Sequence, residues 1–169
     1  MKKILVSGLC ILGVLIMMAS IFYFISDRQR NISIQDITYF SFTYNCGNAI
    51  NANVEYMLKP EEENGKEGKY TVWIKPNGIA DEDKKVFTVD GSFVSRLEKF
   101  LEDNRVGRWN GFKKVDKNVL DGNQFELNIY LEDGTSVNAS GYMRWPKNYA
   151  AVKEGVENIF LSLMEEQPQ

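Results

Sequence analysis

The chain has 169 residues, which is room for one membrane segment and one domain of ordinary size. It carries 20 Lys/Arg and 23 Asp/Glu, and four of the basic but one of the acidic residues precede Asn31. The remainder is therefore acidic, which disfavours nucleic acid as a partner, and the absence of histidine removes serine triads, Cys–His pairs and zinc sites.

Residues 4–25 form an uncharged apolar run that follows two lysines. As a helix this run would measure about 33 Å, enough to cross a bilayer core of about 30 Å. We therefore predict a retained transmembrane signal-anchor over residues 1–26. Two alternatives stay open, a cleaved secretory signal and a lipid anchor on Cys10, although Leu9 stands where a lipoprotein signal has a small residue.

The flanks of the apolar run carry two basic residues on each side, so charge counting alone does not orient it. The free amino terminus and Asp27 favour a cytoplasmic N-terminus, which places the domain outside, and the reversed orientation stays open. Residues 27–33 are a short polar linker that keeps the domain close to the membrane. Residues 34–166 then form the extracytoplasmic domain.

The domain begins with four segments that alternate apolar and polar residues or are rich in β-branched and aromatic ones. They predict strands over residues 37–45, 52–58, 70–75 and 85–89. An apolar stripe then predicts an amphipathic helix over residues 93–104, with Asp90 or Ser92 as its N-cap. These elements form the first half of the predicted domain.

Residues 124–142 show the clearest pattern, two alternating runs joined by Glu132-Asp133-Gly134. We predict a hairpin whose three-residue loop closes with Gly134 at positive φ. Its register pairs Leu131 with Thr135, Ile129 with Val137 and Leu127 with Ala139. A one-residue slip would turn every side chain to the other face, so the shared apolar face fixes this register.

A second amphipathic helix follows Pro146, because apolar residues recur at three- and four-residue spacing from Tyr149 to Leu163. We therefore predict an α+β fold: an N-terminal transmembrane helix, then one antiparallel sheet of about six strands with two amphipathic helices on one face.

The irregular segment over residues 105–122 carries five basic residues against two aspartates. This local positive patch could meet anionic lipid headgroups or an acidic envelope polymer, or could simply solvate a loop. Trp109 and Phe112 flank a turn within it, where their rings either pack in the core or clamp a sugar or peptide.

The polar face of the predicted hairpin is the most distinctive surface. It places amides, hydroxyls and phenols in a row that either binds a glycan or peptide or is the ordinary wet side of the sheet. The candidate ligand-binding residues are Trp109, Phe112, Asn128, Tyr130, Asn138, Tyr142, Arg144 and Trp145.

Four motifs lie within residues 90–164: Trp109-Asn110-Gly111-Phe112, Asp121-Gly122-x-x-Phe125, the Asp133-Gly134 hairpin and Gly141-x-x-x-x-Pro146-x-Asn148-Tyr149. Together they resemble a pattern in uncharacterised membrane-anchored or lipoprotein-like proteins of Gram-positive bacteria. The resemblance implies a location in the bacterial cell envelope and adds no activity, cofactor or catalytic residue.

We therefore expect a single-pass protein of the bacterial cell membrane that acts as a non-enzymatic, extracytoplasmic binding or interaction module. Its partners would be the membrane, through residues 4–25, and an envelope polymer or protein; we expect no cofactor or metal. The alternative is a carboxylate-based hydrolase of envelope glycans. That hypothesis requires a cleft beside Trp109 or Trp145 with two acids about 5 to 9.5 Å apart.

Overall fold

The computed structural model describes residues 16–18, 31–47, 53–61, 68–76 and 83–165. The chain divides into two compact units, Met1–Asn31 and Ile32–Gln169. The predicted membrane segment, residues 4–25, lies outside the described residues except for residues 16–18, which are helical. Within the described ranges no helix is long and apolar enough to cross a membrane.

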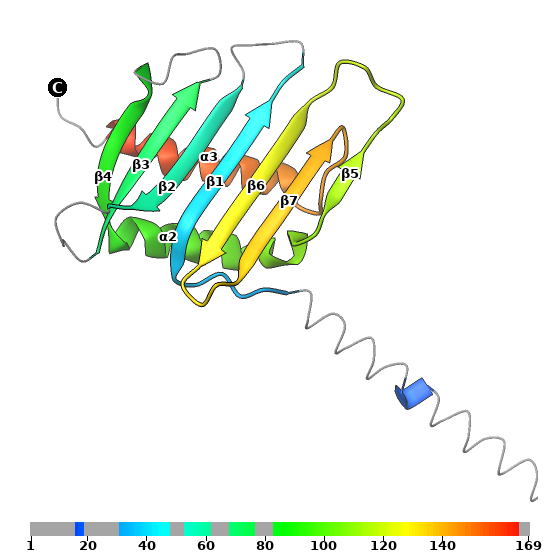
Figure 1. Cartoon of the computed structure of the whole chain (residues 1–169), viewed down its shortest axis with the longest axis horizontal. Coiled ribbons are helices and arrows are strands. Elements are labelled where there is room, and N and C mark those ends of the chain that lie inside the picture. Colours follow the sequence, from blue (N-terminus) through cyan, green and yellow to red (C-terminus); the bar gives the residue numbers. More distant parts are fainter. Residues whose placement is uncertain (1–15, 19–30, 48–52, 62–67, 77–82, 166–169) are drawn as a thin grey trace, which may run out of the picture. The chain divides into compact units, whose positions relative to one another are not determined.

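The second unit is an α+β domain built on one mostly antiparallel sheet (Figure 1). Its strands lie in the order β4-β3-β2-β1-β6-β7-β5. Their bounds are β1 Ile37–Asn45, β2 Val54–Pro60, β3 Lys69–Pro76, β4 Lys85–Asp90, β5 Lys113–Val115, β6 Gln124–Leu131 and β7 Ser136–Tyr142. The helices are α2 (Gly91–Asp103), the 3-10 helix η3 (Val106–Trp109) and α3 (Tyr149–Glu165). Both α-helices lie on the same face of the sheet (Figure 1).

The α+β class, the two amphipathic helices and their placement on one face are confirmed, and the expected strand number is corrected from about six to seven. The additional strand is β5, which pairs in parallel with β7 through Lys113 and Ser140. Three residues, two of them lysine, show no alternation, so neighbouring β7 rather than local pattern holds this strand in the sheet.

The hairpin of β6 and β7 has the predicted register. Leu127 pairs with Ala139 and Ile129 with Val137, and the Leu131 amide donates to the Thr135 carbonyl at 2.9 Å. Gly134 adopts a φ of 82°, a conformation that glycine reaches without a Cβ clash. The shared apolar face and the glycine therefore specify this hairpin together.

The core lies between the sheet and the two α-helices. Phe160 of α3 is fully buried, and its ring centroid lies 5.7 Å from that of Phe40, 5.1 Å from that of Tyr56 and 5.5 Å from that of Phe93. These contacts join two strands and both helices through one aromatic side chain. Aromatic burial thus carries much of the packing between the layers.

The chain enters the domain along the side of α2. The Ile34 amide donates to Glu102 Oε2 at 2.9 Å, and the Ile37 amide donates to Glu98 Oε1 at 2.8 Å. At Gly107 a Cβ would lie 1.7 Å from the Ile32 carbonyl oxygen, so only glycine allows the entering segment to pass η3. The beginning of the domain is therefore fastened to α2 and η3 before β1 starts.

Candidate functional site

A groove of about 580 Å³ lies where the end of α2, η3 and the segment before α3 meet. We call it the basic groove; it is lined by Asp103, Asn104, Arg105, Arg108, Trp109, Phe112, Lys114, Trp145, Pro146, Lys147 and Asn148. These residues come from segments far apart in the sequence, and the fold alone brings them together.

The groove reverses the sign of charge that the rest of the domain carries. Arg105, Arg108, Lys114 and Lys147 are basic, whereas Asp103 is the one acid among the described residues that line it. Asp103 also forms an ion pair with Lys99 at 2.8 Å. Because the groove concentrates cations on an acidic domain, its local field attracts anions.

Two tryptophans contribute to the groove in different ways. Trp109 is only 3% exposed, and its indole N–H donates to the Lys147 carbonyl at 3.1 Å. Trp145 is 37% exposed, and its ring stacks on Tyr149 with the centroids 4.5 Å apart. Trp109 thus joins the two walls, whereas Trp145 offers a fixed aromatic surface to solvent.

Phe112 lies at the edge of the groove and is half-buried. Its ring centroid lies 6.2 Å from that of Phe125, and Lys114 Nζ lies 5.3 Å from the Phe112 ring. Of the two uses expected for Trp109 and Phe112, core packing therefore accounts for Trp109, and Phe112 packs on the core while it keeps one side toward the groove.

The groove is flanked by residues in the left-handed region of backbone conformation. Arg105 has a φ of 55° and Asn148 a φ of 63°, and both line the groove. Left-handed arginine is unfavourable because its Cβ crowds the backbone, and such strain persists where the surroundings enforce it. The residues around Arg105 and Asn148 thus hold the backbone from which these two side chains project.

The open face of the sheet carries the polar row that the sequence predicts. Asn128 Nδ2 donates to Glu126 Oε1 at 3.2 Å, and Asn138 Nδ2 donates to Ser136 Oγ at 2.9 Å. Tyr130 is 47% exposed, with its ring centroid 5.3 Å from that of Tyr39. These side chains therefore bond largely to one another, as in a solvated sheet face.

Two further predicted residues hold a loop in place. The Tyr142 hydroxyl donates to the Leu120 carbonyl and accepts from the Gly122 amide, both at 2.7 Å. Arg144 Nη2 forms an ion pair with Asp116 Oδ2 at 3.1 Å. Tyr142 and Arg144 thus fasten the connection between β5 and β6 and have partners within the protein.

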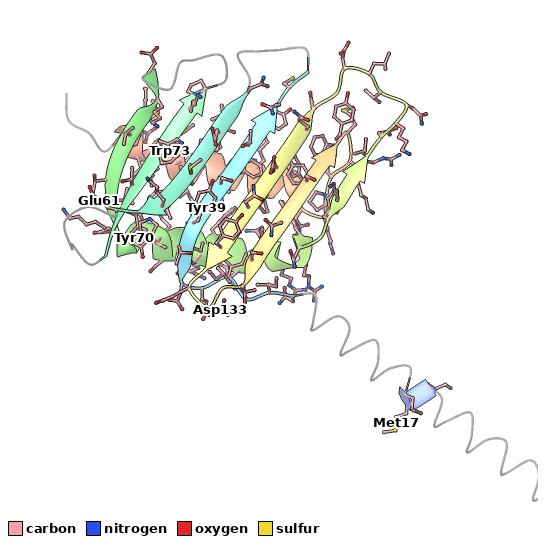
Figure 2. All side chains as sticks on the ribbon, viewed as in Figure 1. Met17, Tyr39, Glu61, Tyr70, Trp73 and Asp133 are labelled. Carbon is pink, nitrogen blue, oxygen red and sulfur yellow. The ribbon has the colours of Figure 1, made fainter. Side chains whose placement is uncertain are left out.

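The other half of the open face carries two large aromatic side chains. Trp73 on β3 and Tyr39 on β1 are half-exposed there (Figure 2). Lys84 Nζ lies 4.8 Å and Lys59 Nζ 5.9 Å from the Trp73 ring. Lysine side chains therefore flank this tryptophan, and it leaves little continuous apolar surface for a partner.

The eight predicted ligand-binding residues therefore do not form one site. Three line the basic groove, Trp109, Phe112 and Trp145, while Asn128, Tyr130, Asn138 and Tyr142 belong to β6 and β7, and Arg144 is paired with Asp116. Arg105, Lys114, Lys147 and Asn148 also line the groove, although they were not among the predicted ligand-binding residues. The positive patch over residues 105–122 was a signal for the first two.

The acids of the groove bear on the hydrolase hypothesis. That hypothesis needs two carboxylates beside Trp109 or Trp145, and among the described lining residues Asp103 is the single one. In the part of the chain that the structure describes, no group of three or more His, Cys, Asp or Glu residues is placed to hold a metal ion.

The fold and the groove define an α+β domain with a cationic, aromatic recess on an acidic surface. No protein-family model matches the chain, and no curated protein matches it. The chemistry of the groove is therefore the guide to function.

Proposed function

We propose that this protein is a membrane-tethered, extracytoplasmic binding module of the bacterial cell envelope, without enzymatic activity, and that the basic groove is its binding surface. The apolar run over residues 4–25 anchors the chain, and residues 27–33 link it to the domain.

The observation that carries this proposal is the composition of the groove. The described residues that line it combine four basic side chains, an exposed tryptophan and a single acid that is already ion-paired. Such a set binds anions and aromatic or apolar surfaces, and it lacks the second carboxylate with which a glycan hydrolase works. Binding is therefore favoured over hydrolysis.

Location is tested by thiol labelling of the full chain in intact bacteria. The chain has two cysteines, so Cys10→Ala with Cys46→Ala gives a cysteine-free background, and Leu120→Cys adds a thiol at a side chain that is 95% exposed. We expect a membrane-impermeant maleimide to label this thiol before lysis. Labelling only after lysis would place the domain inside and overturn the outer-face location.

Binding is tested by retention of envelope material on the full chain in nonionic detergent. Lys147→Glu reverses one charge in the groove, and Lys69→Glu makes the same change at an exposed residue of β3 outside its lining. We expect Lys147→Glu to lose the retained polymer or protein and Lys69→Glu to keep it. Equal losses would show that overall charge, and not the groove, causes retention.

A further inference from the structure

The basic groove draws its cations from three separate segments of the chain. Arg105 follows α2, Lys114 belongs to β5, and Lys147 precedes α3. Like charges gathered in one recess repel one another, and on an acidic domain their clustering is not a consequence of composition. An anionic ligand would relieve this repulsion. The first property that we expect of the ligand is therefore negative charge.

Trp145 sets the second property. One part of its ring is covered by Tyr149, and 37% of the residue remains exposed at the groove. A ring fixed from behind loses little freedom when a ligand packs on its exposed side. The C–H face of a sugar ring is an apolar surface of suitable size for such packing, as is the ring of another aromatic group.

The amides of the groove set the third property. Asn104 donates through Nδ2 to the Phe100 carbonyl at 2.9 Å, which fixes its side chain, and Asn148 is exposed at the rim. Amide groups offer both donors and acceptors, which matches the hydroxyl groups of a saccharide. A ligand with hydroxyls, anionic groups and a C–H face uses all three kinds of lining residue.

Acidic peptides and nucleic acids fit the groove less well. Peptides bind by adding a strand to a sheet edge or by laying a helix into an apolar groove. The edge strand that contributes to the basic groove, β5, has only three residues, and the described lining residues form no continuous apolar stripe. Nucleic acid requires a broad basic surface, which an acidic domain lacks.

We propose that the basic groove binds an anionic saccharide, a sugar chain that carries carboxylate or phosphate groups. Trp145 receives a sugar ring, and Arg105 and Lys147 meet the anionic groups. The inference rests on the proposed function, since it names the ligand class of the same groove.

Calorimetric titration of the full chain in nonionic detergent tests the ligand class. The probes are oligogalacturonate and dextran phosphate as anionic saccharides, fully methyl-esterified oligogalacturonate as the neutral match, and polyglutamate as an anion without sugar. We expect at least one anionic saccharide to bind, more tightly than the neutral match and polyglutamate, and more weakly as salt rises. Failure of both anionic saccharides overturns the inference.

A lipid headgroup carries related chemistry, so phosphatidylglycerol is added to the micelles as a competitor. If phosphatidylglycerol binds the groove more tightly than either anionic saccharide does, the groove is a lipid-headgroup site and the inference fails. If polyglutamate alone bound through the groove, the saccharide inference would be wrong, whereas the proposal of a binding module would still hold. The two proposals therefore fail separately.

Variants locate the binding to the groove. Arg105→Gly removes a cation at a backbone conformation that glycine adopts freely, and Lys69→Gln removes one outside the lining. We expect Arg105→Gly to weaken saccharide binding about three- to tenfold, as for loss of one charge-assisted contact, and Lys69→Gln to leave it within about twofold. Equal effects of the two variants would overturn the assignment.

The aromatic contribution is tested at Trp145. We expect Trp145→Ala to weaken binding about tenfold or more, and Trp145→Phe, which keeps a ring on Tyr149, to weaken it less. Circular dichroism checks that each variant is folded. If Trp145→Ala does not fold, Trp145→Phe still tests the contribution of the ring. Unchanged affinity in the folded variants would show that the tryptophan takes no part.

Discussion

Arg105 offers a direct test of backbone strain beside the groove. It has φ 55° and ψ 40° where α2 ends, the position at which helices favour glycine. The Arg105 amide donates to the Glu102 carbonyl at 2.8 Å, which holds this turn closed. Changing Arg105 to Gly or to Ala removes the same charge and the same side-chain contacts, so the difference between the two variants isolates the backbone term.

The magnitude follows from two opposing effects. A residue with a Cβ is destabilised by roughly 1–2 kcal/mol in this left-handed conformation. Glycine lowers the free energy of unfolding by about 0.5–1 kcal/mol because it has greater freedom in the unfolded chain. We therefore expect Arg105→Gly to exceed Arg105→Ala in free energy of unfolding by about 0.5–1 kcal/mol. At Ser95, an exposed position inside α2, the order should reverse, with alanine the more stable by a similar amount.

Urea denaturation of the full chain in nonionic detergent, followed by tryptophan fluorescence, measures both pairs. All three tryptophans lie in the second unit, so the signal reports on the domain. The slopes against urea should agree among variants, because the surface exposed on unfolding is unchanged. If Arg105→Ala equals or exceeds Arg105→Gly while the Ser95 pair behaves normally, the backbone at residue 105 is not strained and the reasoning is wrong.

Three further predictions concern the domain. The Tyr149 hydroxyl is buried without a hydrogen-bond partner among the described residues, so Tyr149→Phe should keep or raise the free energy of unfolding, by up to about 1 kcal/mol, and a clear loss in urea denaturation would contradict this. Gly107→Ala should lower the free energy of unfolding by at least about 2 kcal/mol, because the new Cβ would collide with the Ile32 carbonyl. A Cβ at Gly91 meets nothing within 4 Å, so Gly91→Ala should change the free energy of unfolding little. Burial, and then the charge of Glu157, raises the pKa of Tyr56 above its ordinary value of 10.0, so the folded state holds this proton more tightly than the unfolded state does. The contribution of Tyr56 to the free energy of unfolding should therefore be full below about pH 10 and be lost as the pH rises above it. In an alkaline titration, stability should fall less steeply in Tyr56→Phe than in the unchanged protein.

The sequence predicts those parts of the fold in which local pattern and tertiary contacts agree. Alternation over β6 and β7 and a glycine at 134 specify the hairpin, and Asp90 caps α2 by accepting from the Ser92 amide at 2.8 Å. The Ser92 hydroxyl also donates to the Asp90 carboxylate, and this hydrogen bond, followed by the one from the Ser92 amide, lowers the pKa of Asp90. In these places each residue prefers the conformation that the whole domain requires.

The basic groove was not predictable in the same way. Its walls come from the end of α2, η3, β5 and the residues before α3, and no periodicity relates Arg105 to Lys147. β5 itself escapes prediction because its three residues gain their structure from pairing with β7. Sequence spacing indicates faces within one element, whereas a site between elements depends on how the elements pack.

The packing of the groove also explains how a small domain can keep a binding surface in place. Trp109 joins η3 to the Lys147 carbonyl, and Trp145 rests on Tyr149, whose ring centroid lies 4.7 Å from that of buried Phe125. The exposed ring is therefore an extension of the core, and its orientation needs no ligand. Because these two aromatic side chains are held in place before binding, little affinity is lost to ordering them. Variants that loosen Trp109 should therefore weaken binding through the groove even though its indole faces the core.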